Sequence, residues 1–372
     1  MLVEGVELRD FRSYARAHAR VGPGLTVVHG ANGAGKSNLL EAIYYGCTGH
    51  SPRTRNEREL IRFGARAARV VVQIADRAQT HELSVGYEAA ADGRPAAKRM
   101  RCDGADVERM LDVDARPLIS VFEPDRLELI KGTPAARRAH LDQLVAALWP
   151  SRAHHRREYS RVLAQRNALL ARIRSGSASR ATLPSWDREL ARTALAVSAD
   201  RVRTVALLAA PFSERAAQLG CRGALELAYR PRSSASSEDE FLAELAARID
   251  RDLERGFSGH GPHRDELSIA REGRELRTYG SQGEQRLALL ALLLAERSVL
   301  EHERGRLPLM LLDDVMSELD GERRELLVAD LAAAGQSVIA TTDLAHVPHA
   351  TASATARLRV GGGSILGEAA AA

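Results

Sequence analysis

The sequence contains a glycine-rich loop whose residue types and spacing suit phosphate binding. Residues 30–37 read GANGAGKS and fit the pattern GxxxxGK[ST]. In this pattern, backbone N–H groups curl around a phosphate, the lysine reaches the β- and γ-phosphates, and the last hydroxyl is offered to Mg²⁺. Lys36 is informative because the arginine-rich chain has only three lysines. The motif predicts a nucleotide site formed by Gly30, Ala31, Asn32, Gly33, Ala34, Gly35, Lys36, Ser37 and Asn38.

A pair of carboxylates follows an apolar run in the last quarter of the chain. Residues 309–312 read LMLL, typical of a buried strand, and Asp313 and Asp314 come directly after them. The carboxyl ends of such strands face the nucleotide in α/β folds, so we expect Asp313 to hold Mg²⁺ together with Ser37. Asp314 would then orient or deprotonate the attacking water. The alternative is that the pair only caps a following helix.

A third motif precedes a long apolar helix. Residues 281–286 read SQGEQR, which alone is typical of a helix N-cap with a turn. Together with residues 317–320 (SELD), they resemble the signature loop and D-loop of ABC-type ATPases. The resemblance implies a head-to-tail dimer in which each signature loop binds the γ-phosphate held by the opposite subunit. The residues implied are Ser281, Gly283 and Gln285 in the signature loop, and Ser317 and Asp320 in the D-loop.

Two further positions of the ABC-type pattern differ in this chain. Thr342 follows the apolar run 337–341, where these enzymes usually carry a switch histidine, so Thr342 is the expected sensor residue. Residues 122–125 read FEPD and offer no metal-binding glutamine, so that role has no candidate.

The elements that must position these motifs follow from the spacing of apolar residues. Expected strands cover 2–11, 25–29, 70–75, 81–87, 98–102, 266–270, 275–279, 308–312 and 337–341, with a turn at Asp92-Gly93. Expected helices cover 38–45, 127–130, 137–148, 159–173 and 282–300. Serine-rich stretches at 175–179 and 233–237 are typical of flexible loops.

The order of these elements and the ABC-type resemblance predict an α/β fold. We expect an ABC-type ATPase head, a mixed sheet around the P-loop helix, built from both ends of the chain. An α-helical subdomain is inserted between them. The expected boundaries are 1–125 for the first part of the head with the Walker A loop, 126–254 for the insertion, and 255–372 for the remainder, with the signature loop, Walker B strand and D-loop.

Composition limits the classes of function. The chain is 45% apolar and 27% charged over 372 residues, which is ordinary for a globular protein. Its longest apolar run, 287–295, is too short for a bilayer, which takes about 20 residues, and no signal-peptide pattern begins the chain. We therefore expect a cytoplasmic protein with no membrane partner. The three cysteines are far apart and expected to be buried thiols, while His260 and His263 are expected to be structural.

Positive charge gathers in one helical stretch. Residues 151–200 hold ten basic and four acidic side chains. Arginines arrayed on one surface suit phosphate contacts, and the chain shows no motif that reads bases. We expect DNA contacts from Arg152, Arg156, Arg157 and Arg161, with Arg166, Arg172 and Arg174 on the same helix. The alternative is a solvated helix face, in which case the next candidates lie in the head: Arg53, Arg55 and Arg58.

Several blocks in order resemble the RecF family of bacterial recombination-mediator ATPases. They are 8–14 (LRDFRSY), 124–134 (PDRLELIKGTP) with Arg137-Arg138 and Leu141-Asp142, 261–265 (GPHRD) and 313–320 (DDVMSELD). The resemblance runs from residue 2 to about 345. It implies an ATP- and Mg²⁺-dependent homodimer with weak, DNA-stimulated ATP hydrolysis. It also implies binding of DNA at single-strand gaps and junctions, and cooperation with RecR and RecO to help RecA displace single-strand-binding protein.

Three competing functions share part of this chemistry. A transporter-type ABC ATPase subunit has its signature loop much closer to the phosphate loop than the 245 residues that separate Lys36 and Ser281 here. An SMC-like chromosome or repair ATPase needs long heptad repeats or, for a zinc hook, a CxxC pair, and the insertion has neither. A clamp that binds ATP with negligible turnover differs only in rate, and the intact pair Asp313 and Asp314 favours hydrolysis.

Overall fold

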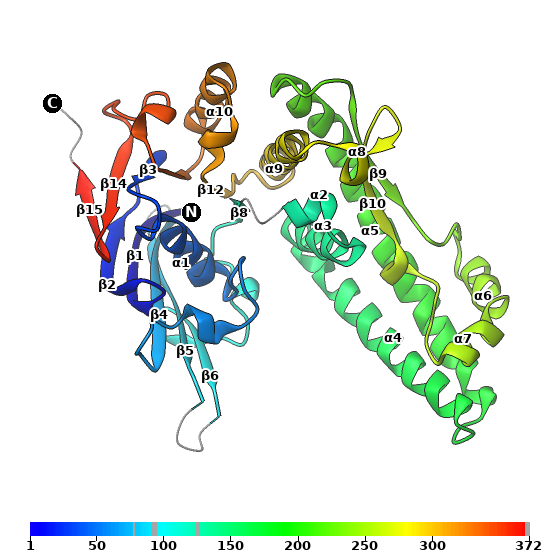
Figure 1. The fold of residues 1–372 in the computed structure, drawn as a ribbon. Helices are drawn as coiled ribbons and strands as arrows, with labels where there is room; N and C mark the ends of the chain where they lie inside the picture. The colour runs from blue at the N-terminus through cyan, green and yellow to red at the C-terminus, as the bar shows by residue number, and fades with distance from the viewer. Residues whose placement is uncertain (77–78, 91–94, 124–126, 369–372) are drawn as a thin grey trace. The chain divides into compact units, whose positions relative to one another are not determined.

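The computed structural model describes residues 1–76, 79–90, 95–123 and 127–368, which form two compact units (Figure 1). The head unit comprises Met1–Arg126 and Gly305–Ala372, and the helical unit comprises Leu127–Arg304. The two ends of the chain therefore meet in one unit, with the middle of the chain inserted between them.

An antiparallel six-stranded sheet forms one layer of the head unit, in the order β2-β1-β4-β5-β6-β7. Its inner face is lined by alternate apolar residues such as Val6, Val70 and Val85, all fully buried. The predicted turn at Asp92-Gly93 lies outside the described residues. The strands are β1 (Leu2–Phe11), β2 (Tyr14–Arg20), β4 (Ala67–Asp76), β5 (Gln79–Glu88), β6 (Ala97–Cys102) and β7 (Ala105–Asp106).

A second six-stranded sheet has the order β15-β14-β3-β13-β12-β8 and is parallel except for β15. Its strands are β3 (Leu25–His29), β8 (Ile119–Phe122), β12 (Leu309–Asp313), β13 (Ser337–Thr341), β14 (Ala356–Gly361) and β15 (Ser364–Glu368). Parallel pairing brings the carboxyl ends of β3, β12 and β13 to one edge, where the predicted nucleotide motifs follow.

Helix α1 (Lys36–Thr48) joins the two sheets of the head unit. Its buried residues Leu39, Leu40 and Ile43 belong to one apolar cluster with residues of both sheets. The unit also contains α10 (Gly321–Ala333) and the short 3₁₀ helices η1 (Glu57–Leu60), η2 (Met110–Asp112), η7 (Val315–Glu318) and η8 (Leu344–His346).

The helical unit is organised around two long neighbouring helices, α4 (Ala153–Arg174) and α5 (Leu183–Gln218). Their apolar faces meet through Tyr159, Val162, Leu190 and Ala194. The other helices are α2 (Glu128–Lys131), α3 (Pro134–Leu148), α6 (Glu238–Ala246), α7 (Ile249–Arg255), α8 (Leu276–Tyr279) and α9 (Gln282–Arg304). A small sheet holds β9 (Leu225–Arg230), β10 (Glu266–Arg271) and β11 (Arg274–Glu275).

The boundary between the helical unit and the second part of the head differs from the prediction. The second part of the head begins at Gly305, whereas residue 255 was predicted. Residues 255–304 group with the helical unit because β10 pairs along its length with β9, and α9 packs on α5.

One predicted strand is wrong. Residues 275–279 form the end of β11 and the single turn of α8, which Gly280 closes by donating its N–H to the Leu276 carbonyl at 2.9 Å. A strand would bury alternate residues, whereas Leu276 is buried and Tyr279 is 65% exposed. The other predicted strands and helices are confirmed with shifts at their ends, the largest at α4, which begins at Ala153 instead of residue 159.

Two expectations from composition can be compared with the structure. No helix among the described residues is both long and apolar enough to cross a bilayer. Cys47 is buried as expected, and burial raises the pKa of its thiol to about 12. Cys102 and Cys221 are only half-buried, so the expectation of three buried thiols is wrong for these two.

Candidate nucleotide-binding site

The glycine-rich loop connects β3 to α1, and its shape depends on its glycines. Gly33 and Gly35 have φ values of +75° and +113°, a region that other residues rarely adopt. A Cβ on Gly35 would also lie 2.8 Å from Ser13 Oγ, and one on Gly30 would lie 2.2 Å from the Val360 carbonyl oxygen. The loop therefore holds its backbone close to its neighbours, as a phosphate-binding loop at a helix N-terminus requires.

Lys36 begins α1 beneath this loop. Its Nζ donates hydrogen bonds to the carbonyl oxygens of Gly30 at 2.9 Å and Ala31 at 3.0 Å. Burial lowers the pKa of Lys36, and the nearby charges of Asp313 and Asp314 act in the opposite direction. The ammonium group thus contacts the loop and lies within reach of the charges of the acidic pair.

Ser37 and Asp313 come together although they are far apart in the sequence. Asp313 ends β12 and is 8% exposed, and its carboxylate accepts a hydrogen bond from the Ser37 side chain. Burial raises the pKa of Asp313, while this hydrogen bond and the charge of Arg53 lower it. A hydroxyl oxygen and a carboxylate oxygen side by side are ligands that fit Mg²⁺.

Asp314 occupies a constrained backbone position beside this pair. Its φ of +49° lies in the left-handed region, and its N–H donates to the Ala340 carbonyl on β13 at 3.1 Å. The side chain is half-buried, and Asp314 precedes η7 without capping it through its side chain. The alternative reading of Asp314 as a helix cap therefore has no support from its contacts.

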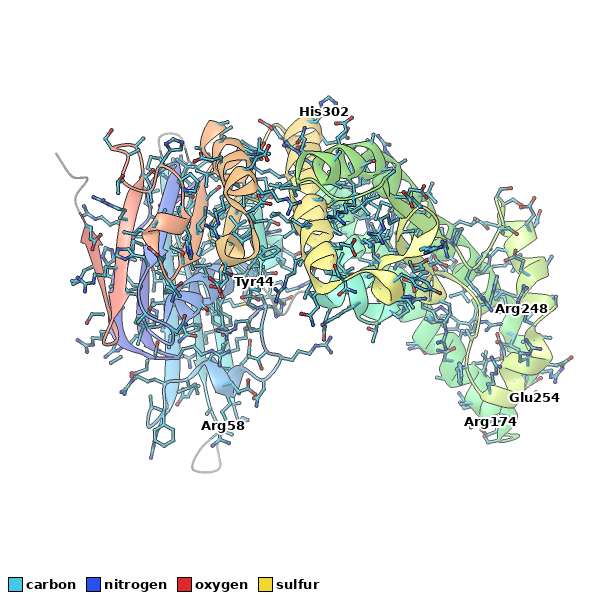
Figure 2. The ribbon with its side chains drawn as sticks, turned by 45° about the horizontal axis from the view of Figure 1, so that its top comes forward. Tyr44, Arg58, Arg174, Arg248, Glu254 and His302 are labelled. Carbon is cyan, nitrogen blue, oxygen red and sulfur yellow. The ribbon has the colours of Figure 1, made fainter. Side chains whose placement is uncertain are left out.

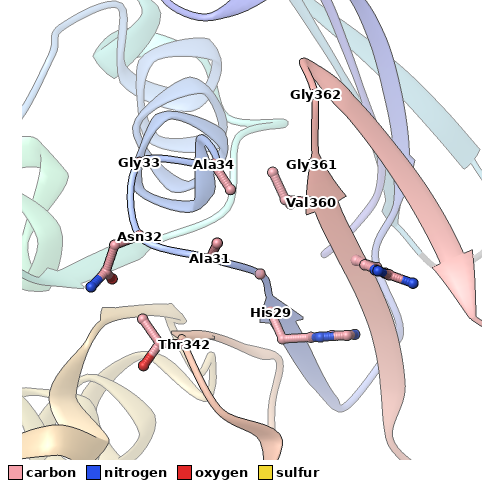
Figure 3. A pocket seen from close by; sticks show the side chains of 11 residues that line it. His29, Ala31, Asn32, Gly33, Ala34, Thr342, Val360, Gly361 and Gly362 are labelled. Atoms are coloured by element: carbon pink, nitrogen blue, oxygen red, sulfur yellow. The ribbon is translucent and has the colours of Figure 1, made fainter.

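A pocket of about 590 Å³ opens beside the loop (Figure 3). Residues 30–34 form one wall, Thr342 lies across from them, and residues 359–362 of the β14–β15 hairpin form another wall. The predicted sensor Thr342 is thus exposed next to the phosphate loop.

The turn between β1 and β2 contributes contacts that the sequence motifs did not reveal. The Tyr14 hydroxyl donates to the Gly35 carbonyl at 2.9 Å, and burial raises the pKa of Tyr14. Asn38, predicted to be part of the nucleotide site, donates from Nδ2 to Ser13 Oγ at 3.0 Å. This turn therefore braces the start of α1.

A buried carboxylate on α1 was also missed. Glu41 is fully buried and accepts two hydrogen bonds from Arg12, at 2.8 and 2.7 Å, and one from Ser51 Oγ at 2.6 Å. Arg53 Nη1 lies 3.4 Å from the same carboxylate and 3.2 Å from Asn38 Oδ1. The block LRDFRSY was a signal for Arg12, but no spacing rule pairs it with Glu41.

The three arginines of the head unit that are candidates for DNA contact differ in their surroundings. Arg53 is held by Glu41 and Asn38 beside the nucleotide loop. Arg55 and Arg58 are exposed.

The predicted signature loop lies in the helical unit, at the start of α9. The Ser281 N–H donates to the Glu284 carboxylate at 2.8 Å, and the Glu284 N–H donates to the Ser281 hydroxyl at 3.3 Å. This reciprocal pair is a capping box. Ser281 and Gly283 are exposed, whereas Gln285 is buried and donates to the carbonyls of Leu276 and Gly280. The side-chain amide of Gln285 is therefore directed toward its own loop.

The predicted D-loop residues take local roles in the head unit. Ser317 Oγ donates to the Asp314 carbonyl at 2.8 Å. Asp320 caps α10 by accepting the Arg323 N–H at 3.0 Å. Both Ser317 and Asp320 are exposed.

The arginines of α4 differ in their surroundings. Arg152 pairs with Asp200 at 2.7 Å, and Arg156 pairs with Asp142 at 2.8 Å. Arg157 and Arg161, one helical turn apart, are exposed. Arg172 and Arg174 are also exposed, with Arg174 at the end of α4 (Figure 2).

The expectation that Arg166 contacts DNA is wrong. Its side chain is fully buried and bonds to Asp187 at 2.7 Å, Asp252 at 3.0 Å and Ser258 at 2.6 Å. The helical spacing of arginines alone could not distinguish this inward position from the exposed ones.

The block GPHRD forms a structural junction in the helical unit. Gly261 has a φ of +126°, and a Cβ there would lie 2.8 Å from the Tyr159 hydroxyl. His263 Nδ1 bonds to that hydroxyl at 2.6 Å, and burial lowers the pKa of His263 to about 4. His260 pairs with Glu244 at 2.5 Å. Both histidines have structural partners, and no metal-binding cluster of acidic, histidine and cysteine side chains occurs among the described residues.

Comparison with known proteins agrees with this geometry. The family model for the RecF/RecN/SMC N-terminal domain matches residues 2–359. A protein from Anaeromyxobacter sp. (strain Fw109-5) named DNA replication and repair protein RecF is 39% identical over 98% of this chain and 99% of its own length. A protein of the same name from Herpetosiphon aurantiacus is 36% identical over 92% of this chain and 94% of its own.

Solved structures give the same relationship. A structure of the recombination mediator protein RecF with ATPrS has a TM-score of 0.85 and 26% identity, covering 99% of this chain and 98% of that one. An SMC head bound to the winged-helix domain of ScpA, 18% identical with a TM-score of 0.59, shares the fold. The predicted α/β ATPase-head fold with its helical insertion is thus confirmed. The chain belongs to the RecF/RecN/SMC family and, within it, to the RecF proteins of DNA replication and repair.

Proposed function

We propose that this protein is an ATP-dependent DNA-binding protein of recombinational repair and replication restart. It binds single-strand gaps and junctions as an ATP-closed homodimer and, with RecO and RecR, assists the loading of RecA. The proposal places it in the cytoplasm, without a membrane partner. The observation that carries it is the convergence of the glycine-rich loop, Ser37 and Asp313 at one sheet edge.

The residues around this edge have complementary tasks in the proposed reaction. Backbone N–H groups of residues 30–37 bind phosphate oxygens, and Lys36 carries the positive charge toward the β- and γ-phosphates. Ser37 and Asp313 hold Mg²⁺, which when bound offsets negative charge on the phosphates. Asp314 accepts the proton of the attacking water, because it adjoins Asp313 on a constrained backbone.

The second half of each site is proposed to come from another subunit. Ser281 and Gly283 are exposed at the start of α9, where a helix N-terminus favours an anion. Gln285 supports them from within the loop by its two bonds to backbone carbonyls. Ser317 and Asp320 lie on the exposed D-loop, and Thr342 serves as the sensor. Hydrolysis is slow and DNA-stimulated in this scheme, because it depends on closure of the dimer.

The proposed DNA contacts of the helical unit are carried by Arg157 and Arg161, which are exposed on one face of α4. Arg152 and Arg156 also contribute, each beside the aspartate with which it pairs. On the head unit, Arg55 and Arg58 are exposed candidates, and Arg53 acts at the nucleotide loop through Glu41 and Asn38.

Sedimentation of the purified protein with ATP, ADP or no nucleotide, each with and without gapped DNA, tests the proposal. We expect a dimer with ATP, stabilised by gapped DNA, and a monomer with ADP. A monomer under all conditions, or a dimer indifferent to nucleotide, would contradict it. Parallel measurement of phosphate release separates a hydrolysing switch from a clamp that only binds ATP.

A further inference from the structure

The strand register of the antiparallel sheet places four arginines in one line. Arg16 on β2 lies directly opposite Arg9 on β1, and Arg9 lies opposite Arg69 on β4. Gly86 on β5 lies opposite Arg69, and Arg99 on β6 lies opposite Gly86. Residues directly opposite one another project to the same face of a sheet. We call Arg9, Arg16, Arg69 and Arg99 the arginine row.

The arginine row lies on the outer face of this sheet. Residues that alternate with it, such as Leu8, Val70 and Val85, are buried against the core, whereas all four arginines are exposed. Their side chains form no ion pair with a carboxylate among the residues that the structure describes. One member of the row, Arg69, donates a hydrogen bond from Nε to Ser84 Oγ at 3.0 Å.

Such an arrangement disfavours folding. Like charges directly opposite on neighbouring strands destabilise a sheet. Glu7 on β1 and Glu88 on β5 lie on this face, each two positions along its strand from the line of the row, and neither pairs with it. Repulsion between neighbouring strands that nothing else in the fold offsets is expected at a functional surface.

A basic pocket of about 540 Å³ adjoins the row between β1 and β4. It is lined by Arg9 and Arg69 of the row, by one carboxylate, Asp10, and by residues of the preceding loop, including Arg62 and Arg66. Arg62 pairs with Asp10 at 2.8 Å. Phe63, between Arg62 and Gly64 of this lining, is 99% exposed. An aromatic side chain left entirely in water has no packing role in this unit.

We propose that the arginine row and Phe63 form a binding surface for single-stranded DNA on the head unit. The proposal rests on the proposed function, since it assumes that the protein binds DNA. Four strand spacings of 4.7–4.9 Å give the row a length of about 19 Å, which suits several consecutive phosphates of one strand. Phe63 supplies a stacking platform for an unpaired base, which a duplex does not offer.

Substitution of two central members of the row tests the binding of phosphates. The variant Arg9→Ala with Arg69→Ala, as the full chain, is titrated with labelled oligothymidylate at several salt concentrations. We expect the affinity to fall at least tenfold, and the slope of log affinity against log salt to flatten by about 0.7 for each phosphate that is no longer neutralised. The variant Arg9→Lys with Arg69→Lys should retain most of the slope.

Two controls establish that charge position, and not net charge or folding, is responsible. Arg222→Ala with Arg274→Ala removes two exposed arginines of the helical unit and should leave the oligothymidylate affinity unchanged. The melting temperature of the Arg9/Arg69 alanine variant should equal or exceed that of the parent, because repulsion between opposite strands is relieved.

Phe63→Ala tests base stacking separately. We expect it to weaken binding of oligothymidylate about fivefold or more and to leave binding of blunt duplex unchanged. Normal oligothymidylate binding by both the row variant and Phe63→Ala would overturn this inference, and parental binding of gapped DNA would leave the proposed function intact. If the parent protein binds no DNA of any form, the proposed function fails as well. If the row variant loses binding to polyglutamate but still binds oligothymidylate normally, the surface binds an acidic protein. That result would also overturn this inference.

Discussion

The side chain of Ser37 is hydrogen-bonded to the buried carboxylate of Asp313, which joins the first turn of α1 to the carboxyl end of β12. The two residues come from opposite ends of the chain and meet inside the head unit. The position of the hydroxyl and that of the carboxylate are therefore set together. Lys36 lies next to both residues. A substitution at any of the three is therefore expected to alter the surroundings of the other two.

Replacing Lys36 tests the phosphate-binding role of the loop. Lys36→Met removes the ammonium group that contacts Gly30 and Ala31 and that is proposed to face the β- and γ-phosphates. We expect much weaker ATP binding, measured by fluorescence titration with a labelled ATP analogue. The fold of the helical unit should be unchanged by circular dichroism, and equal ATP affinity in the folded variant would refute the role.

The role of Asp314 as base is tested by Asp314→Asn. The amide keeps the shape of the side chain and leaves Asp313 to hold Mg²⁺, so ATP should still bind. Hydrolysis should fall by roughly 10² or more because no group accepts the proton of water. An ATP-bound dimer should accumulate in sedimentation. Hydrolysis at the parental rate would show that Asp314 is structural.

The local motifs could be predicted from the sequence because their chemistry is contiguous. The glycine loop, the acid pair after an apolar strand and the N-cap at Ser281 each need only a few neighbouring residues. The position of β13 between β3 and β12 was not predicted, because it depends on the pairing of strands far apart in the sequence.

Contacts between distant segments could not be predicted in this way. The pair Arg12 and Glu41 depends on how the β1–β2 turn reaches α1, and the line formed by Arg9 and Arg69 depends on strand register. Arg166 shares helical spacing with the exposed arginines, yet it is buried and bonded to Asp187 and Asp252, which come from other segments. In each case, the partner lies in another part of the sequence.

The buried carboxylate of Glu41 should contribute strongly to the stability of the head unit. Glu41→Gln leaves the partly exposed guanidinium of Arg12 without its negative partner, so we expect the free energy of unfolding to fall by about 2 kcal/mol in urea titrations. Glu59→Gln, an exposed carboxylate of the same unit, is the matched control and should change it by less than about 0.5 kcal/mol. An equal loss of unfolding free energy in the two variants would show that the buried pair of Glu41 and Arg12 does not stabilise the head unit.

His263 should make the stability of the helical unit depend on pH. Burial lowers its folded-state pKa from the ordinary 6.5 to about 4, so the unfolded chain takes up a proton first as the pH falls. Its contribution is present above pH 6.5 and is lost as the pH falls toward 4, by about 2 kcal/mol at pH 5. Urea unfolding at neutral pH and at pH 5 measures this loss. His263→Asn should reduce the difference between the two pH values, and an unchanged difference would assign the dependence to other groups.

DNA binding by the helical unit should depend on Arg157 and Arg161, two of the exposed arginines of α4. Arg157→Ala with Arg161→Ala removes guanidinium groups one turn apart, and we expect affinity for gapped duplex to fall for all sequences alike. The slope of log affinity against log salt should flatten by about 0.9 for each duplex phosphate that is no longer neutralised. Arg222→Ala with Arg274→Ala supplies the control of equal charge, and the ATPase rate without DNA should not change because α4 contains none of the nucleotide motifs. An unaltered slope with unaltered affinity would show that this face of α4 is only solvated, and that DNA binds the head unit alone.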